Sequence, residues 1–103
     1  MTIRTLVAAG LLIAGTAHAD PFADAHPEAG GEIHTNQCVA CHATSFGGAE
    51  GSEIYTRSDR RVTSPDALLQ QITFCTTQLD LGLFPEDERD IAAYLNMHYY
   101  HFQ

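Results

Sequence analysis

The sequence contains no lysine, and its five basic residues are all arginine, against thirteen aspartate and glutamate residues. The resulting net charge of −8 repels phosphate backbones and anionic lipid surfaces. We therefore expect neither nucleic-acid binding nor docking to anionic membranes. The same charge suits a partner protein that presents a basic docking patch.

Regular alternation of apolar and polar residues is also missing, and no internal repeat is present. A strand buried on one face needs such alternation, whereas apolar residues three or four positions apart are typical of a helix. A length of 103 residues allows one small domain and excludes a doubly wound nucleotide-binding fold. The composition, 45% hydrophobic and 17% charged, is that of a globular protein. We predict an all-α domain of three to four short helices.

No apolar run is long enough to cross a bilayer, which takes roughly 20 residues. The apolar stretch at residues 6–13 follows Arg4 and precedes small residues at 17–19, which end in Ala-His-Ala. This layout is typical of a secretory signal peptide. We predict residues 1–19 to be a signal peptide cleaved after Ala19, and residues 20–103 to be a periplasmic domain with no stable membrane insertion. A domain of that size usually needs a disulfide, a metal or a cofactor to support its core.

Proline and glycine mark the expected helix boundaries. Pro27 suits the first turn of a helix, which we expect to run to about Cys38 after an irregular lead-in. Gly30 and Gly31 each weaken that helix by about 1 kcal/mol relative to alanine. Their presence indicates that another backbone comes close at this point.

Two further helices are expected beyond a long loop at residues 43–59. Ser64 is a good N-cap, and Pro65 suits the first position of a helix that carries an apolar face and reaches Cys75. A turn that contains Gly82 separates this helix from a last one, which opens with Pro85 and several acidic residues. The last helix carries a broad apolar stripe and must pack inward.

One short motif carries chemistry. Cys38-Val39-Ala40-Cys41-His42 has the Cys-x-x-Cys-His pattern of covalent haem attachment. Two thiols at this spacing on a helical turn can each reach one vinyl group of a porphyrin, and the adjacent imidazole can then ligate the iron. We predict that Cys38, Cys41 and His42 bind one haem c, with His42 as the ligand of its iron. No catalytic residue is predicted.

Other uses of these cysteines fit less well. A zinc ribbon needs a second pair of ligands, and only Cys75 is left. A thioredoxin-like centre needs its Cys-x-x-Cys at the start of a helix that follows a strand, whereas here the motif is expected to close a helix. A disulfide between Cys38 and Cys41 would close a very small loop and constrain the unfolded chain little.

With this motif the chain resembles the small monohaem cytochromes c of class I. In that family a helix before the haem cysteines crosses a C-terminal helix that bears an aromatic-leucine pair. Gly30 and Ile33 match the first helix, and Tyr94-Leu95 matches the last. The resemblance covers nearly all of residues 20–103. It implies a cytochrome c-like fold around a covalently attached haem, with close contact of the two helices at Gly30.

The resemblance leaves the sixth iron ligand open. The family usually supplies a methionine just before the last helix, but residues 74–84 contain none, and Met97 is the only methionine in residues 20–103. Cys75 could ligate iron, form an intermolecular disulfide or be buried as a small apolar residue. Residues 75–77 and 85–88 also faintly resemble the sphaeroides haem protein group. That group has an asparagine ligand and a nearby disulfide, neither of which this stretch can supply.

The remaining histidines and arginines have weaker assignments. His34 stands where the family often carries an aromatic residue, so packing is expected of it. His98 and His101 belong to an aromatic cluster at the C-terminus. Together with His26 and His34 they stay open as less favoured candidates for the sixth iron ligand. Three arginines lie within five residues in this acidic chain, and guanidinium groups are suitable partners for haem propionates; they are Arg57, Arg60 and Arg61.

Two functions follow as hypotheses. The first is an electron-transfer protein, not an enzyme, that passes electrons between periplasmic redox partners. The alternative is a protein that binds NO, CO or O₂ at an open or weakly held sixth haem position. A thiol oxidoreductase that uses Cys38 and Cys41 would require both thiols to be free.

Overall fold

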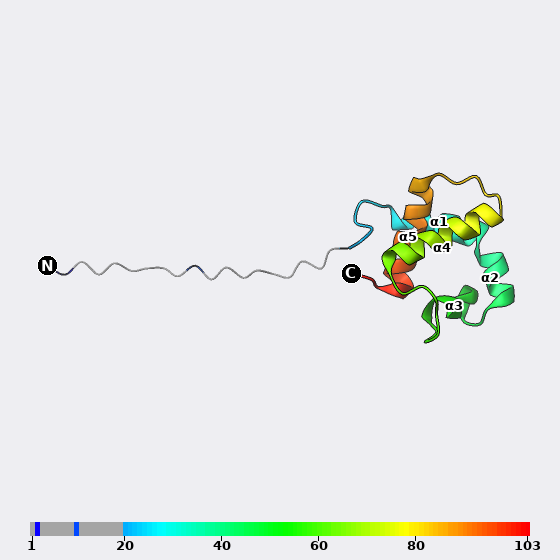
Figure 1. Cartoon of the computed structure of the whole chain (residues 1–103), viewed down its shortest axis with the longest axis horizontal. Coiled ribbons are helices and arrows are strands. Elements are labelled where there is room, and N and C mark those ends of the chain that lie inside the picture. The colour runs from blue at the N-terminus through cyan, green and yellow to red at the C-terminus, as the bar shows by residue number, and fades with distance from the viewer. Residues whose placement is uncertain (1, 3–9, 11–19) are drawn as a thin grey trace.

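The computed structural model describes Thr2, Gly10 and residues 20–103. Along residues 20–103 the helices are α1 (Pro27–Gln37), α2 (Val39–Ser45), η1 (Ala49–Gly51), α3 (Glu53–Thr56), α4 (Pro65–Gln78), α5 (Pro85–Leu95) and the π-helical turn η2 (Asn96–Tyr100) (Figure 1). Over this range there is no strand, which confirms the all-α prediction. The predicted signal peptide lies outside the described residues except for Thr2 and Gly10. Among the described helices, none combines the length and the hydropathy that a membrane crossing requires.

The number of helices differs from the prediction: residues 20–103 form five α-helices instead of three or four. The two additional ones, α2 and α3, lie where a helix end and a long loop were expected. Cys38 caps the end of α1 and also precedes α2, so the Cys-x-x-Cys-His motif opens a short helix as well as ending one. Short helices of this kind give no clear periodicity, because four to seven residues make only one or two turns.

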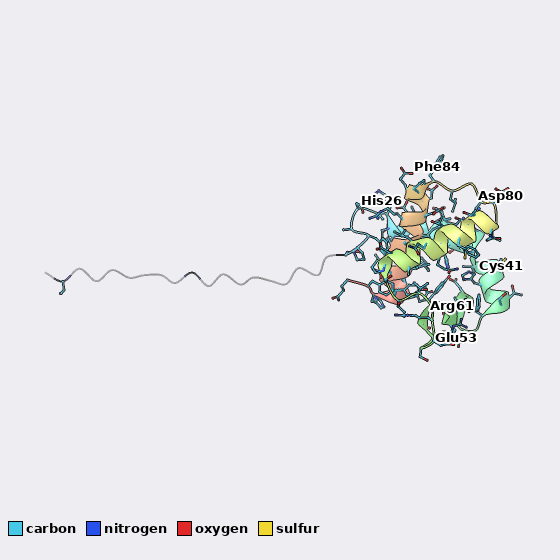
Figure 2. The ribbon with its side chains drawn as sticks, viewed as in Figure 1. His26, Cys41, Glu53, Arg61, Asp80 and Phe84 are labelled. Atoms are coloured by element: carbon cyan, nitrogen blue, oxygen red, sulfur yellow. The ribbon has the colours of Figure 1, made fainter. Side chains whose placement is uncertain are left out.

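The predicted helix starts are confirmed. Ser64 caps α4, since its Oγ accepts a hydrogen bond from the Ala67 backbone N–H at 3.1 Å. Pro65 and Pro85 are the first residues of α4 and α5. At the start of α5 the Asp87 carboxylate accepts from the Phe84 backbone N–H at 3.0 Å. The turn between α4 and α5, marked in Figure 2 by Asp80 and Phe84, uses positive φ angles.

Helices α1 and α5 cross in close contact at Gly30. A Cβ atom placed on Gly30 would overlap the backbone carbonyl of Asp90. Glycine is therefore required at this position because no side chain fits between the two backbones. Gly31 lies in the same crossing against the ring of Tyr94. The expectation that these glycines mark the approach of another backbone is confirmed.

The core lies where α4 and α5 pack together and is closed by the lead-in before α1. Leu68 and Ile72 of α4 join Ile91 and Leu95 of α5 in one buried cluster. Phe22, from the lead-in, is also part of it, with 2% of its surface exposed.

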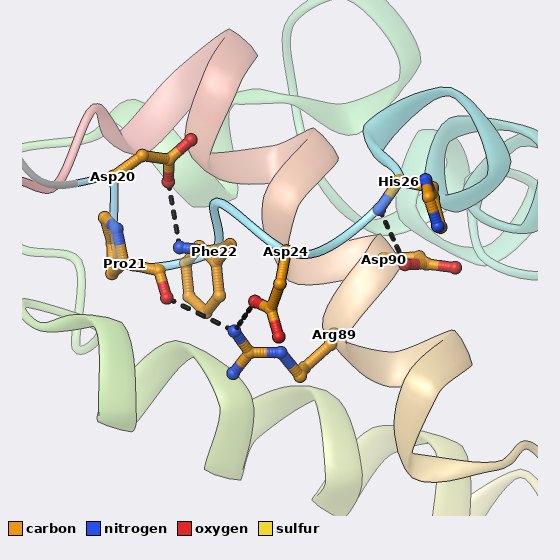
Figure 3. A network of polar contacts seen from close by, with 7 residues as sticks. All are labelled: Asp20, Pro21, Phe22, Asp24, His26, Arg89 and Asp90. Carbon is orange, nitrogen blue, oxygen red and sulfur yellow. Dashed lines mark hydrogen bonds and ion pairs between the residues drawn. The ribbon is translucent and has the colours of Figure 1, made fainter.

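Polar contacts hold the lead-in against α5 (Figure 3). The Arg89 guanidinium pairs with the Asp24 carboxylate and lies over the Phe22 ring. The Asp90 carboxylate accepts from the His26 backbone N–H at 2.8 Å. These contacts fix Phe22 in the core, although the sequence around it predicted only an irregular segment.

After α5 the helix widens into the π-helical turn η2 and then ends. His101 takes a left-handed conformation with φ 58°, which ends the helix. The buried Asn96 side chain then bonds the backbone of Phe102 twice: its Oδ1 accepts from the N–H at 2.6 Å, and its Nδ2 donates to the C=O at 3.1 Å. The aromatic C-terminus is thereby held against α3, which contacts η2.

Candidate functional site

A largely apolar cavity lies beside the Cys-x-x-Cys-His motif. About 440 Å³ of empty space lies within it, a figure that includes open solvent. Cys38 and His42 line it from the end of α1 and from α2. The facing walls come from α4 and α5 and are mainly aliphatic; they include Leu68, Ile72, Ile91 and Leu95. A planar apolar group placed here would supply packing contacts to the side chains of the cavity walls.

A second hollow, named the outer hollow because exposed arginines line it, adjoins this cavity. The two share His42, Tyr55 and Cys75 in their walls. The outer hollow, about 850 Å³ including open solvent, adds Arg57 and Arg61. The two hollows together thus combine mainly aliphatic walls with two guanidinium groups.

His42 is held by a hydrogen-bonded chain of three side chains. The Tyr55 hydroxyl lies 2.7 Å from Nδ1 of His42 and 2.8 Å from Nε2 of His34. Tyr55 and His34 are buried, with 5% and 1% of their surfaces exposed. Because Tyr55 occupies Nδ1 of His42, Nε2 is the ring nitrogen that remains for a ligand.

The backbone around these residues is closely fitted. A Cβ on Gly51 would overlap the carbonyl of His42, and Gly51 has a φ of +75°. Only glycine suits this position, because it needs both a left-handed backbone and close contact with the end of α2. The resulting turn brings α3, and with it Tyr55, back toward His42. The Arg60 guanidinium donates to the Tyr55 carbonyl at 3.0 Å and so secures α3 from its other side.

Burial favours the neutral forms of the three hydrogen-bonded side chains, His34, Tyr55 and His42. It lowers the pKa of His34 to about 4, with a smaller contribution from His42. It also lowers the pKa of His42 and raises that of Tyr55 well above the usual phenol value. Neutral imidazole is the form that ligates metals, so His42 is ready to act as a ligand at neutral pH.

No disulfide joins the three cysteines of residues 20–103, which lie at different depths. Cys38 is partly buried in the cavity wall, and burial raises its pKa, with smaller contributions from Cys75 and Cys41. A raised pKa is the opposite of what a nucleophilic redox thiol needs. Cys41 is exposed on α2, outside the cavity wall (Figure 2). The structure therefore brings Cys38 and His42 together at the cavity and leaves Cys41 beside it.

Of the candidates for a sixth ligand, Cys75 and His34 lie at the cavity. Cys75 lines both hollows from α4, and the Gln71 amide donates to its sulfur at 3.3 Å. Met97 is 55% exposed on η2, away from the cavity walls. His98 and His101 are exposed as well. His34 lines the cavity, but its Nε2 is taken by Tyr55.

The three arginines that were expected to be partners for haem propionates divide into two kinds. Arg57 and Arg61 line the outer hollow, and Arg57 lies 3.5 Å from the Asp59 carboxylate at an exposed position. Arg60 stacks instead over the rings of Tyr100 and Phe102, at 5.1 and 5.9 Å from their centroids. Arg60 therefore serves packing, whereas Arg57 and Arg61 are exposed and line the outer hollow.

Tyr55 is the site residue that sequence reasoning missed. It is thirteen positions from His42 in a stretch that was expected to be a loop, and no motif marks it. Only the turn at Gly51, together with the short α3, brings its hydroxyl to the imidazole.

No three histidine, cysteine or acidic side chains cluster among residues 20–103 as the ligands of an all-protein metal site would. The comparisons with known proteins add no family: the chain matches no protein-family model, no curated protein and no solved structure.

Proposed function

We propose that residues 20–103 form a periplasmic monohaem c-type cytochrome that carries electrons between redox partners. The observation that carries the proposal is the position of the Cys-x-x-Cys-His motif: Cys38 and His42 line the same largely apolar cavity. The resemblance to class I cytochromes c agrees with the close α1–α5 crossing at Gly30.

The residues present fit a haem. Cys38 and Cys41 would hold it through thioether bonds, and His42 would ligate its iron through Nε2. The aliphatic side chains of α4 and α5 would cover the macrocycle and keep water from it. Arg57 and Arg61, which line the outer hollow, are suitable partners for its propionates. When bound, the haem supplies one-electron chemistry, and the protein sets its ligation, burial and surroundings.

The surface charge supports a carrier with a protein partner. A net charge of −8 favours encounter with a basic patch on that partner. Such electron-transfer complexes are small and short-lived, and their association slows as the salt concentration rises. We expect the association of this protein with its partner to slow in the same way as the salt concentration rises.

One observation favours the second candidate, a protein that binds NO, CO or O₂. Met97 is exposed and lies away from the cavity, so the usual thioether ligand is not in place. The CO-binding spectrum of the reduced protein separates the two functions. A carrier with a strong sixth ligand keeps its spectrum under CO, whereas an open or weakly held iron gives a CO-shifted absorption band.

Covalent attachment is tested by expressing the full chain with a haem-maturation system in a periplasm-containing host. Haem staining of a denaturing gel should show colour at the mass of the processed chain. Cys38→Ala and Cys41→Ala should each weaken or abolish the stain, whereas Cys75→Ala, the matched control, should keep it. A wild-type band without stain, or equal staining of all three variants, would overturn the proposal.

A further inference from the structure

The geometry points to Tyr55 as the positioning residue for the iron ligand: its hydroxyl, backed by His34, holds the His42 ring with Nε2 free and thereby tunes the ligand strength of the imidazole. The inference rests on the proposed function, in which His42 ligates haem iron. It concerns residues of this chain that the Cys-x-x-Cys-His motif does not include.

The hydroxyl has one proton and two imidazole neighbours, so it must donate to one ring and accept from the other. A neutral imidazole that ligates through Nε2 carries its proton on Nδ1. His42 Nδ1–H must then donate to the Tyr55 oxygen across 2.7 Å, and the Tyr55 O–H donates to His34 Nε2 across 2.8 Å. In the reverse arrangement Tyr55 would donate to His42 Nδ1, and the proton of the neutral ring would occupy Nε2. Ligation therefore selects one of the two proton arrangements.

His34 completes the chain at a cost that a purely structural residue would avoid. Its side chain is 1% exposed, and its Nδ1 is a buried polar atom without a hydrogen-bond partner. An aromatic hydrocarbon would fill the same space without an unpaired nitrogen. The imidazole is useful here because its Nε2 accepts the proton of Tyr55 and so fixes the direction of the chain.

The three residues come from three helices, so the arrangement is held from several sides. His34 lies on α1 near the α5 crossing, His42 on α2 and Tyr55 on α3. The Tyr55 ring packs against those of Tyr99 and Tyr100, with centroids 5.2 and 5.8 Å away. A partner fixed in this way orients a ligating histidine and raises its basicity. A more basic imidazole stabilises ferric iron, so the hydrogen bonds from His34 through Tyr55 to His42 should lower the reduction potential of the haem.

The test compares Tyr55→Phe with Tyr99→Phe in the haem-loaded protein expressed as the full chain. The Tyr99 ring packs against the Tyr55 ring but lines neither hollow and lies outside the chain of three, so its variant controls for the loss of a neighbouring phenol hydroxyl. We expect Tyr55→Phe to raise the midpoint potential and to change the low-temperature electron paramagnetic resonance of ferric iron, and Tyr99→Phe to leave both near wild type. Equal potentials and spectra for wild type and Tyr55→Phe, or equal shifts in both variants, would overturn the inference.

A measurement on the wild type covers the case in which Tyr55→Phe fails to mature. In holoprotein labelled with ¹⁵N-histidine, the Nδ1 proton of His42 should be visible and should exchange slowly with solvent, because Tyr55 covers it. Rapid exchange of that proton would contradict the inference while leaving covalent haem intact. A wild-type protein without covalent haem would instead overturn the proposed function and the inference together.

Discussion

Replacement of Gly30 by alanine tests the account of how α1 and α5 cross. The new methyl group would overlap the Asp90 carbonyl, which belongs to a helix backbone and cannot rotate away as a side chain could. Overpacking of this kind costs about 1–3 kcal/mol, and a rigid backbone neighbour places this case at the upper end. Alanine regains about 1 kcal/mol of helix propensity. The net loss is about 2 kcal/mol, which corresponds to a fall in melting temperature of roughly 8–16 °C for a domain of this size.

Thermal unfolding followed by circular dichroism at 222 nm measures this loss. Ala29→Gly is the matched control: Ala29 is the exposed neighbour on α1, and its replacement costs only the propensity difference of about 1 kcal/mol. Gly30→Ala should therefore destabilise more than Ala29→Gly, although propensity alone predicts the opposite sign. A Gly30→Ala protein as stable as wild type, or more stable, would refute the close crossing.

Three further predictions follow from described contacts. Asn96→Ala should lower the free energy of unfolding by about 2 kcal/mol in urea titrations, because both backbone groups of Phe102 lose their partner; a change below about 0.5 kcal/mol would contradict the capping role. Folding holds the pKa of His34 at about 4, below its usual 6.5, so the unfolded chain binds more protons between these values, and stability should fall by at most about 3 kcal/mol as pH drops through this window. His34→Gln should flatten that slope, and an unchanged slope would assign it to other groups. The double variant Arg57→Gln/Arg61→Gln removes two guanidinium partners of the haem propionates and should therefore shift the reduction potential of the haem-loaded protein. Arg60→Gln should mainly lower the melting temperature, because it removes the packing on Tyr100. The reverse pattern would contradict the division of the arginines.

The elements that the sequence predicted well are those with local signals. Proline at positions 27, 65 and 85 and the Ser64 cap mark helix starts through chemistry that acts within one turn. Gly30 was informative for a different reason, since a glycine that costs helix propensity must be explained by a neighbour. The cysteine-histidine motif also has a local signal, its fixed spacing, but the haem attachment that it indicates stays a prediction.

The elements that were missed depend on contacts between distant segments. Phe22 is buried because Arg89 and Asp90 hold the lead-in, and the sequence around Phe22 contains no sign of those partners. The helices α2 and α3 are too short to show a period, and they persist because Gly51 folds the chain back onto His42. Tyr55 could not be assigned without that turn. Burial within reach of two histidines is a property of the folded chain and not of the segment that contains Tyr55.

The most direct test of the central claim is the intact mass of the exported protein under denaturing conditions, measured after treatment with a thiol-alkylating reagent. The account predicts the mass of residues 20–103 plus one haem, with one alkylated cysteine, which is Cys75. A chain that carries no haem and three alkylated cysteines would contradict it.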